Sequence, residues 1–417
     1  MNRIKTYRFK LMPTKAQENA FVCWLGTTRY IYNLCLEYKM RLYADCGISI
    51  SKNDIQKELT ALKNDVPWMK ELNAQTIQAV VDRLFLAYDA FFRRVKNGET
   101  PGFPKFTNKN RHKSFRFKQD VKLLSKESKL FLPKIGHVRF HKSQAIEGTI
   151  KTASIKKESS GWYVYLACEV DIAPLPLVEG TIGIDLGLKH AVVTSDGEVF
   201  DGPKALQERE RQLKKAQQRL SRTEKRSNNR KKAIVEVSRI YEVIRNTRKD
   251  FLHKTSSALV RENQTIIAEA LQVKNLVRRC KPKQDENGKF VPNGQAAKSG
   301  LNKSFSDAGL GALLDMLEYK AAWAGRTFIR VPAAYTSMDC SACGWRNHEL
   351  TLADREWTCG GCGVLHDRDG NAARNILARG LKEINKGAGA PLLHLETRTE
   401  TFEPVGAEAE GPNHAEQ

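Results

Sequence analysis

Residues 340–371 read CSACGWRNHELTLADREWTCGGCGVLHDRDGN, and this stretch joins a cysteine motif to a carboxylate motif. The cysteines form two C-x2-C pairs separated by 15 residues, which is the spacing of a zinc ribbon. Four thiolates complete a tetrahedral Zn²⁺ site and leave no position for substrate, so we expect this metal to stabilise the fold and not to take part in catalysis. Two disulfides or four unrelated cysteines are the alternative interpretations. The predicted zinc ligands are Cys340, Cys343, Cys359 and Cys362.

Carboxylates follow the cysteines at once and also end two apolar segments earlier in the chain. Asp185 lies within the segment Thr181–Val193, and Glu269 follows the apolar run 265–268. A buried carboxylate is costly unless it is paired or binds a cation. If both acids meet one carboxylate of the Asp-Arg-Asp motif, either Asp367 or Asp369, two divalent cations would relieve their repulsion and support phosphodiester hydrolysis. Without this convergence, each acid is a helix cap or a surface charge.

The charge of the chain predicts a polyanionic partner. The 417 residues include 69 Lys and Arg against 47 Asp and Glu, a formal net charge of +22. The excess is steepest in residues 204–254, where 17 basic residues face six acidic ones along two amphipathic segments interrupted at 221–229. We therefore expect a basic helical hairpin that lines a nucleic acid. A charged, solvated face and an acidic membrane surface are the alternatives.

The length and the hydrophobic pattern predict several domains and no membrane span. A chain of 417 residues is too long for one ordinary core, so two to four domains are expected. It has no run of about 18 apolar residues and no signal-peptide segment, which favours a cytoplasmic protein. The sequence is compatible with a monomer but does not decide the oligomeric state.

Periodicity predicts where these domains lie. Residues 1–12 alternate as a strand, and Thr14 with Gln17 forms a capping box that opens a helical unit reaching to about residue 97. Short alternating segments from 102 to 170 indicate a small β-barrel. From Thr181 the chain alternates strands and helices, including a capped helix beginning near Ser304. A last helix, Ala372–Glu383, is expected to start within the Asp-Arg-Asp-Gly-Asn segment. Residues 387–417 turn polar and acidic, which predicts a disordered tail.

Several of these segments, taken in order, resemble the TnpB family of transposon-encoded proteins, which are similar to the ancestors of type V CRISPR effectors. The resemblance covers about residues 1–380. It rests on YRFKLMPT at 7–14, GFPKF at 102–106, GIDLG at 183–187, AEAL at 268–271, YTS at 335–337 and HDRDGNAARNI at 366–376.

The resemblance implies an RNA-guided endonuclease that cleaves double-stranded DNA beside a short flanking motif, with a guide RNA derived from the transposon end. By it, Asp185, Glu269 and Asp369 are the catalytic, Mg²⁺-binding acids, and Asp367 is a reserve candidate for the third position.

The implied fold is multi-domain, combining α+β and α/β parts. Residues 1–12 and 100–177 would form a β-barrel wedge, and residues 13–99 a helical recognition lobe inserted between its parts. Residues 178–335 and 366–386 would form a RuvC-like nuclease domain of ribonuclease H fold. It would carry the basic hairpin 203–262 and an inserted, target-nucleic-acid-binding zinc ribbon at 336–365.

Other functions remain open at this stage. A nuclease-inactive RNA-guided repressor predicts broken acids, whereas all three are present. A guide-free nuclease or transposase of the same fold would cut DNA without RNA. An actin-like or sugar-kinase ATPase would use GIDLG as a phosphate loop, but it needs neither a basic hairpin nor a zinc ribbon, and short glycine strings are weak signals.

Overall fold

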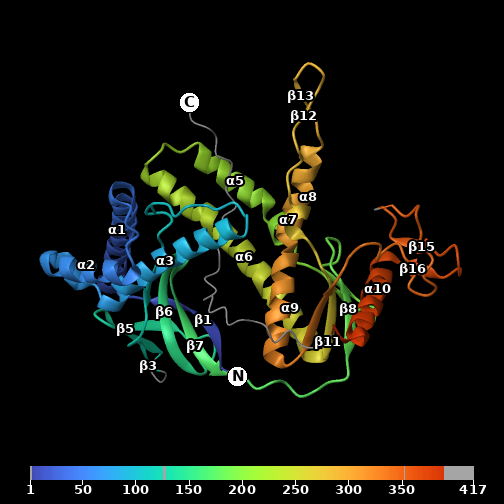
Figure 1. Ribbon diagram of the computed structural model, residues 1–417, viewed down its shortest axis with the longest axis horizontal. Helices are drawn as coiled ribbons and strands as arrows, with labels where there is room; N and C mark the ends of the chain where they lie inside the picture. Colours follow the sequence, from blue (N-terminus) through green and yellow to red (C-terminus); the bar gives the residue numbers. More distant parts are fainter. Residues whose placement is uncertain (1, 125–127, 352, 389–417) are drawn as a thin grey trace. The chain divides into compact units, whose positions relative to one another are not determined.

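The computed structural model describes residues 2–124, 128–351 and 353–388 and divides into two compact units (Figure 1). The first unit ends at Asp171 and the second begins at Ile172. The tail predicted for 387–417 lies, from residue 389 onward, outside the described residues.

The first unit contains a seven-stranded antiparallel sheet with the order β2-β6-β7-β1-β5-β4-β3. Its core strand β1 alternates as predicted, with Tyr7, Phe9 and Leu11 buried on one face. Because β2 and β3 lie at opposite edges, the predicted barrel is an open half-barrel sheet in the described residues. The strands are β1 (Asn2–Met12), β2 (Ser114–Phe117), β3 (Lys122–Leu124), β4 (Lys129–Leu132), β5 (Gly136–His141), β6 (Thr149–Glu158) and β7 (Gly161–Asp171).

Three α-helices and one short 3-10 helix form the helical unit predicted between β1 and β2. The capping box is present, since the Thr14 side chain accepts from the Gln17 N–H and the Gln17 side chain accepts from the Thr14 N–H. Phe21 and Trp24 of the first helix pack against Phe115 of β2, which fixes that helix on the sheet. The helices are α1 (Lys15–Cys46), α2 (Lys52–Asp65), η1 (Pro67–Glu71) and α3 (Ala74–Lys96).

The second unit contains a five-stranded mixed sheet with the order β10-β9-β8-β11-β14. Strands β8, β11 and β14 are parallel to one another, whereas β9 and β10 continue from β8 as an antiparallel meander. The strands are β8 (Thr181–Asp185), β9 (Val192–Thr194), β10 (Val199–Phe200), β11 (Thr265–Glu269) and β14 (Thr327–Val331).

Helices cover both faces of this sheet. Apolar residues of α6 and α9 pack against Ile182 and Ile184 of β8 and Ile266 of β11 on one face, while α10 packs against Ile267 and Val331 on the other. The basic hairpin is present as α5 and α6, which lie side by side in Figure 1. The helices are α4 (Ala205–Glu208), α5 (Glu210–Ser221), α6 (Asn228–Glu262), α7 (Val273–Leu276), α8 (Gln295–Ala308), α9 (Leu310–Ala324), α10 (Arg368–Glu383) and η3 (Ile384–Ala388).

One predicted helix start was wrong, and another is confirmed. The apolar residues expected in a helix from Ser304 lie in α9, which begins at Leu310 after Gly309, and Ser304 itself lies inside the preceding helix α8. Asp307 caps neither helix; it accepts from the Leu206 N–H and pairs with Arg248 at 2.9 Å. The last helix begins at Arg368, within the Asp-Arg-Asp-Gly-Asn segment as predicted, and ends at the predicted Glu383.

Two small antiparallel pairs complete the second unit. One is the hairpin of β12 (Lys283–Gln284) and β13 (Phe290–Val291), which projects beyond α8 in Figure 1. The other, β15 (Glu356–Thr358) with β16 (Leu365–Asp367), lies in the cysteine module. Within the described parts of the chain, no helix combines the length and apolar character needed to cross a bilayer.

Candidate functional site

Two of the predicted acids end neighbouring parallel strands. Asp185 is the last residue of β8 and Glu269 the last residue of β11, and the pairing of Ile184 with Ala268 places the two acids side by side at the same edge of the sheet. Because side chains alternate along a strand, Asp185 shares the face of Gly183, and Glu269 shares the face of Ile267. Ile267 packs against α10, so both acids lie on the face that α10 covers.

Close packing of α10 on the sheet brings the third acid to this edge. A Cβ atom on Gly183 would lie 2.3 Å from the Ala373 carbonyl oxygen, and one on Gly380 would lie 2.4 Å from Ile267 Cδ1. Glycine at these two positions therefore lets the helix approach the strands closely. Asp369 lies in the first turn of α10 and is thereby presented at the end of β8.

The two carboxylates of the Asp-Arg-Asp motif have different roles. Asp367 is the N-cap of α10, and its Oδ1 accepts a hydrogen bond of 2.7 Å from the Gly370 N–H. Asp369 is not used in capping; its side chain is 18% exposed and lies 3.7 Å from Arg355 Nη1. The geometry thus leaves Asp369, and not Asp367, available beside the other acids.

Burial raises the pKa of two of the acids, and one of them is also affected by its acidic neighbours. Burial raises the pKa of Asp185 to about 8, and the negative charges of Glu269 and Asp369 act in the same direction. Burial also raises the pKa of Glu269 to about 7. The Leu186 N–H lowers both pKa values by hydrogen bonding and does not overcome these effects. The structure therefore places Asp369 beside two carboxyl groups, Asp185 and Glu269, whose negative charge is disfavoured, and a cation would relieve this cost.

The four predicted cysteine ligands come together in one cluster. Their Sγ atoms all lie within 4.8 Å of one another, with 3.7 Å between Cys340 and Cys362 and 3.5 Å between Cys343 and Cys359. A tetrahedral zinc with Zn–S bonds of about 2.3 Å requires sulfur separations of about 3.8 Å, so the thiols fit this metal. Among the residues that the structure describes, they are the one group of three or more potential ligands gathered this tightly.

A buried histidine, which the sequence analysis did not single out, supports the cysteine cluster. His366 Nε2 lies 3.0 Å from Cys340 Sγ, and the ring packs on Trp357 at 4.9 Å between centroids. An N–H group directed at a thiolate stabilises its negative charge and orients the ligand. In the sequence, the only indication that His366 has a role was its position directly before Asp367 of the carboxylate motif.

A polar ladder on α10 links the cysteine module to the acidic edge. Asn371 accepts from the Ser341 N–H and donates to the Asp339 carbonyl oxygen, each at 2.8 Å. Asn375 donates to the Thr336 and Asp339 carbonyl oxygens at 2.8 and 2.6 Å. One turn further on, Arg379 donates to the Ala334 carbonyl oxygen at 2.6 Å. Asn371, Asn375 and Arg379 are spaced four residues apart and therefore lie on one face of the helix, and this spacing could have predicted the ladder.

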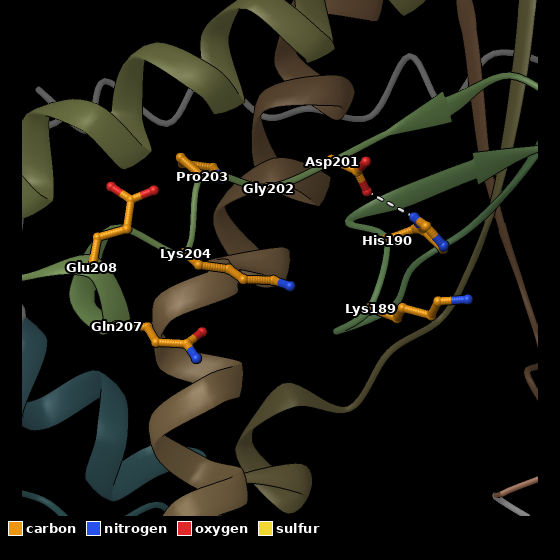
Figure 2. A pocket seen from close by; sticks show the side chains of 8 residues that line it. All are labelled: Lys189, His190, Asp201, Gly202, Pro203, Lys204, Gln207 and Glu208. Carbon is orange, nitrogen blue, oxygen red and sulfur yellow. Dashed lines mark hydrogen bonds and ion pairs between the residues drawn. The ribbon is translucent and has the colours of Figure 1, made fainter.

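A cavity of about 690 Å³ lies at the end of the sheet where β8 turns into β9 and β10 leads into α4. His190 Nδ1 lies 2.7 Å from Asp201 Oδ1, and Figure 2 shows the Lys204 side chain extending toward the turn that carries Lys189 and His190. Within the described residues, neither lysine ammonium has a hydrogen-bond or ion-pair partner. The lining is polar and partly basic, and no periodic pattern in the sequence indicated it. The lining residues are Lys189, His190, Asp201, Gly202, Pro203, Lys204, Gln207 and Glu208.

Three family descriptions match parts of the chain. Residues 165–279 match the OrfB_IS605 family, described as "Probable transposase", and residues 311–376 match the "Cas12f1-like, TNB domain". Residues 1–47 match a family described as "Helix-turn-helix domain". In the structure this last stretch is β1 followed by the single continuous helix α1.

Curated relatives align over nearly the whole chain. The chain is 31% identical to "Putative RNA-guided DNA endonuclease InsQ" of Escherichia coli (strain K12), covering 91% of this chain and 93% of the relative. It is 32% identical to "Putative RNA-guided DNA endonuclease" of Streptomyces pristinaespiralis, covering 93% and 92%. One solved structure, titled "Cryo-EM structure of the Cas12f1-sgRNA-target DNA complex", matches with a TM-score of 0.50, 13% identity and coverage of 90% of this chain and 99% of that one. This match shows a shared α+β fold.

Proposed function

We propose a function for this chain on the basis of its family: it belongs to the TnpB family of transposon-encoded proteins. The proposed function is that of an RNA-guided endonuclease that cleaves double-stranded DNA beside a short flanking motif. The observation that carries the proposal is the convergence of the acids that end β8 and β11 with the first turn of α10, inside a chain of net charge +22. Base pairing with a guide RNA from the transposon end would supply sequence specificity, while the protein binds backbones.

We assign Asp185, Glu269 and Asp369 to catalysis in a RuvC-like domain of ribonuclease H type. The sheet order, with an antiparallel meander on one side of β8 and parallel strands on the other, supports that fold. The three carboxylates suit Mg²⁺, which prefers oxygen ligands and, when bound, would polarise the scissile phosphate and lower the pKa of water. The chain itself supplies the ligand oxygens, and the pairing of β8 with β11 and the close packing of α10 hold the three acids at one edge of the sheet.

The cavity between Lys189 and Lys204 supports the same function. It lies at the edge of the sheet where Asp185 ends β8, and its ammonium groups suit the phosphates of a strand that enters the site. Helices α5 and α6 add a long basic surface to this unit.

The remaining domain assignments are proposals of the same kind. We assign residues 1–12 and 100–177 to a wedge domain and 13–99 to the recognition lobe. Residues 336–365 are assigned to a target-nucleic-acid-binding ribbon whose four thiols hold a structural Zn²⁺. We place the protein in the cytoplasm of a bacterium or archaeon, where a transposon transcript and DNA targets meet.

The test uses the full chain co-purified with RNA transcribed from the end of its own transposon. Linear DNA carrying the guide-matched target, with a randomised flank, is incubated with Mg²⁺, and the cut ends are sequenced. We expect cleavage that requires the RNA and the metal, is abolished by Asp185→Ala, and is unchanged by Asp196→Ala, an exposed acid in the turn between β9 and β10.

The same assay separates the alternatives. A guide-free nuclease would cut equally well without RNA. A nuclease-inactive repressor would bind the target in the presence of RNA but leave it intact, and either result would overturn the proposal.

A further inference from the structure

An exposed tyrosine at the acidic edge of the second unit has an unfavourable backbone conformation. Tyr335 has a φ of 62°, in the left-handed region that side chains rarely adopt, and it is 52% exposed. Of the non-glycine residues with positive φ in the described chain, it is the only aromatic one. Its carbonyl oxygen accepts hydrogen bonds from the Met338 and Asp339 N–H groups, so a tight turn holds the conformation. Residues held in such conformations concentrate at functional sites.

One face of the Tyr335 ring rests on a fixed guanidinium. Arg346 Cζ lies 4.0 Å from the ring centroid, and the Arg346 Nε and Nη2 atoms donate to the two carboxylate oxygens of Asp339 at 2.6 and 3.3 Å. Asp339 in turn pairs with Arg379 of α10 at 3.1 Å. With one face covered and half of the residue exposed, the opposite face of the ring is open to solvent.

The ring has no packing role like that of the neighbouring tryptophan. Trp345 covers the turn between Cys359 and Cys362, where a Cβ atom would meet the Trp345 ring at 3.0 Å from Gly360 and at 3.1 Å from Gly361. Among the described residues no other aromatic ring stacks on Tyr335, so the face opposite Arg346 has no aromatic partner.

The position of Tyr335 relates it to the acids. It follows the end of β14 by four residues, and β14 is the parallel neighbour of β11, which ends in Glu269. The residues on either side of it are tied to α10, since Arg379 donates to the Ala334 carbonyl oxygen and Asn375 to that of Thr336. The first turn of the same helix carries Asp369.

We propose that the open face of Tyr335 is a stacking platform for one nucleobase of the single DNA strand that enters the acidic site. Aromatic faces bind bases of any sequence, and a ring held rigidly beforehand loses little entropy on binding. A base fixed on this ring would hold the adjacent phosphates at the sheet edge where the acids lie. This inference rests on the proposed function and adds a substrate-binding residue to it.

The decisive variant is Tyr335→Gly, because glycine adopts a φ of 62° without strain and the fold should be retained. Tyr335→Trp is the matched variant that keeps a stacking surface. The probe is a fluorescent single-stranded DNA bound to the full chain with its guide RNA, without divalent cations so that no cleavage occurs. A second series of the same oligonucleotide carries one abasic site, moved base by base through the region of the cut.

We expect Tyr335→Gly to weaken binding of the intact oligonucleotide about tenfold and Tyr335→Trp to leave it near the wild-type value. One abasic position should weaken wild-type binding by a similar factor and should make the Gly variant no weaker, because both changes remove the same contact. Equal binding by the Gly variant and the wild type, or equal losses on every oligonucleotide, would overturn the platform. A loss confined to guide RNA affinity would overturn it too, since the ring would then bind RNA.

The binding assay needs no cleavage and so tests the platform separately from the nuclease. Wild-type protein that binds as predicted but never cuts would contradict the proposed function alone. Wild-type protein that cuts, with a Gly variant that binds and cuts equally well, would contradict the platform alone.

Discussion

Replacing Gly183 by alanine tests how the nuclease site is assembled. A Cβ atom at this position would lie 2.3 Å from the Ala373 carbonyl oxygen and 2.7 Å from the Leu377 backbone nitrogen, both in α10. Real Cβ atoms do not approach this closely, and neither neighbour is the end of a flexible side chain. The helix therefore has to move away from β8 and take Asp369 away from Asp185.

The cost follows from two opposing effects. Overpacking of a well-packed core costs about 1–3 kcal/mol, and a contact with rigid backbone belongs at the upper end of that range. Replacing glycine also restricts the unfolded chain, which returns about 0.4–1 kcal/mol. We expect Gly183→Ala to lower the free energy of unfolding of the second unit by about 2 kcal/mol and to reduce cleavage strongly.

Two other glycines provide controls. Gly300 lies within α8, and a Cβ atom there would meet nothing within 4 Å, so Gly300→Ala should raise stability by about 1 kcal/mol. The three atoms nearest to a Cβ on Gly380 all belong to the Ile267 side chain, so adding Ile267→Ala to Gly380→Ala should recover part of the loss. A second substitution of this kind cannot relieve Gly183→Ala, because the added Cβ atom would clash with backbone atoms of α10.

The measurement is urea unfolding followed by circular dichroism, with the transition of the second unit identified as the one that Gly300→Ala shifts upward. Cleavage rates are measured on the same preparations. If Gly183→Ala matched the wild type in both stability and cleavage, α10 would not pack as described and the argument for convergence would be refuted.

Three further predictions address the metal sites and the acids. Cys359→Ser should release zinc and lower the melting temperature, whereas the control Cys280→Ser should keep about one zinc per chain by elemental analysis. Unchanged zinc content in Cys359→Ser would contradict the zinc ribbon. The Asp367→Asn variant should cleave DNA normally, because asparagine caps helices as well as aspartate does, whereas the Asp369→Asn variant should not cleave. The reverse pattern in a cleavage assay would make Asp367 the third metal ligand. In metal-free protein the free energy of unfolding should fall as pH rises from about 4 to about 8. The folded state raises the pKa of Asp185 to about 8, so in this range it keeps a proton that the unfolded chain has lost. Asp185→Asn should flatten this fall in urea titrations, and parallel curves for variant and wild type would count against the buried acid.

Local chemistry is what the sequence predicts best. The capping box of Thr14 and Gln17 was predicted from a three-residue spacing and is confirmed, because both partners lie within one helical turn. The same pattern at Ser304 and Asp307 failed. Asp307 instead accepts from the Leu206 N–H and pairs with Arg248, and neither partner is near it in the chain. A local motif therefore predicts a local contact only where no distant partner competes for the same side chain.

The convergence of the acids illustrates the same limit. Periodicity predicts that β8 and β11 are strands, but it does not predict that they are parallel neighbours with Ile184 opposite Ala268. That register depends on the apolar faces buried by α6, α9 and α10, which lie up to about 200 residues away in sequence. Only the resemblance to a family, and not the residue pattern, pointed to Asp369 over Asp367; the cap geometry supplies the physical reason.

The cysteine module and the acidic edge are connected through hydrogen bonds made by α10. Asn371, Asn375 and Arg379 repeat every fourth residue on α10 and bind the backbone at positions 332–341, the segment that leads into Cys340. Asn371 is fully buried, so its amide bonds are shielded from water and costly to break. A change that frees this segment also frees the helix that presents Asp369. Loss of zinc should therefore reduce cleavage even though the metal takes no part in the chemistry, because α10 needs an ordered segment opposite its ladder to hold Asp369 beside Asp185.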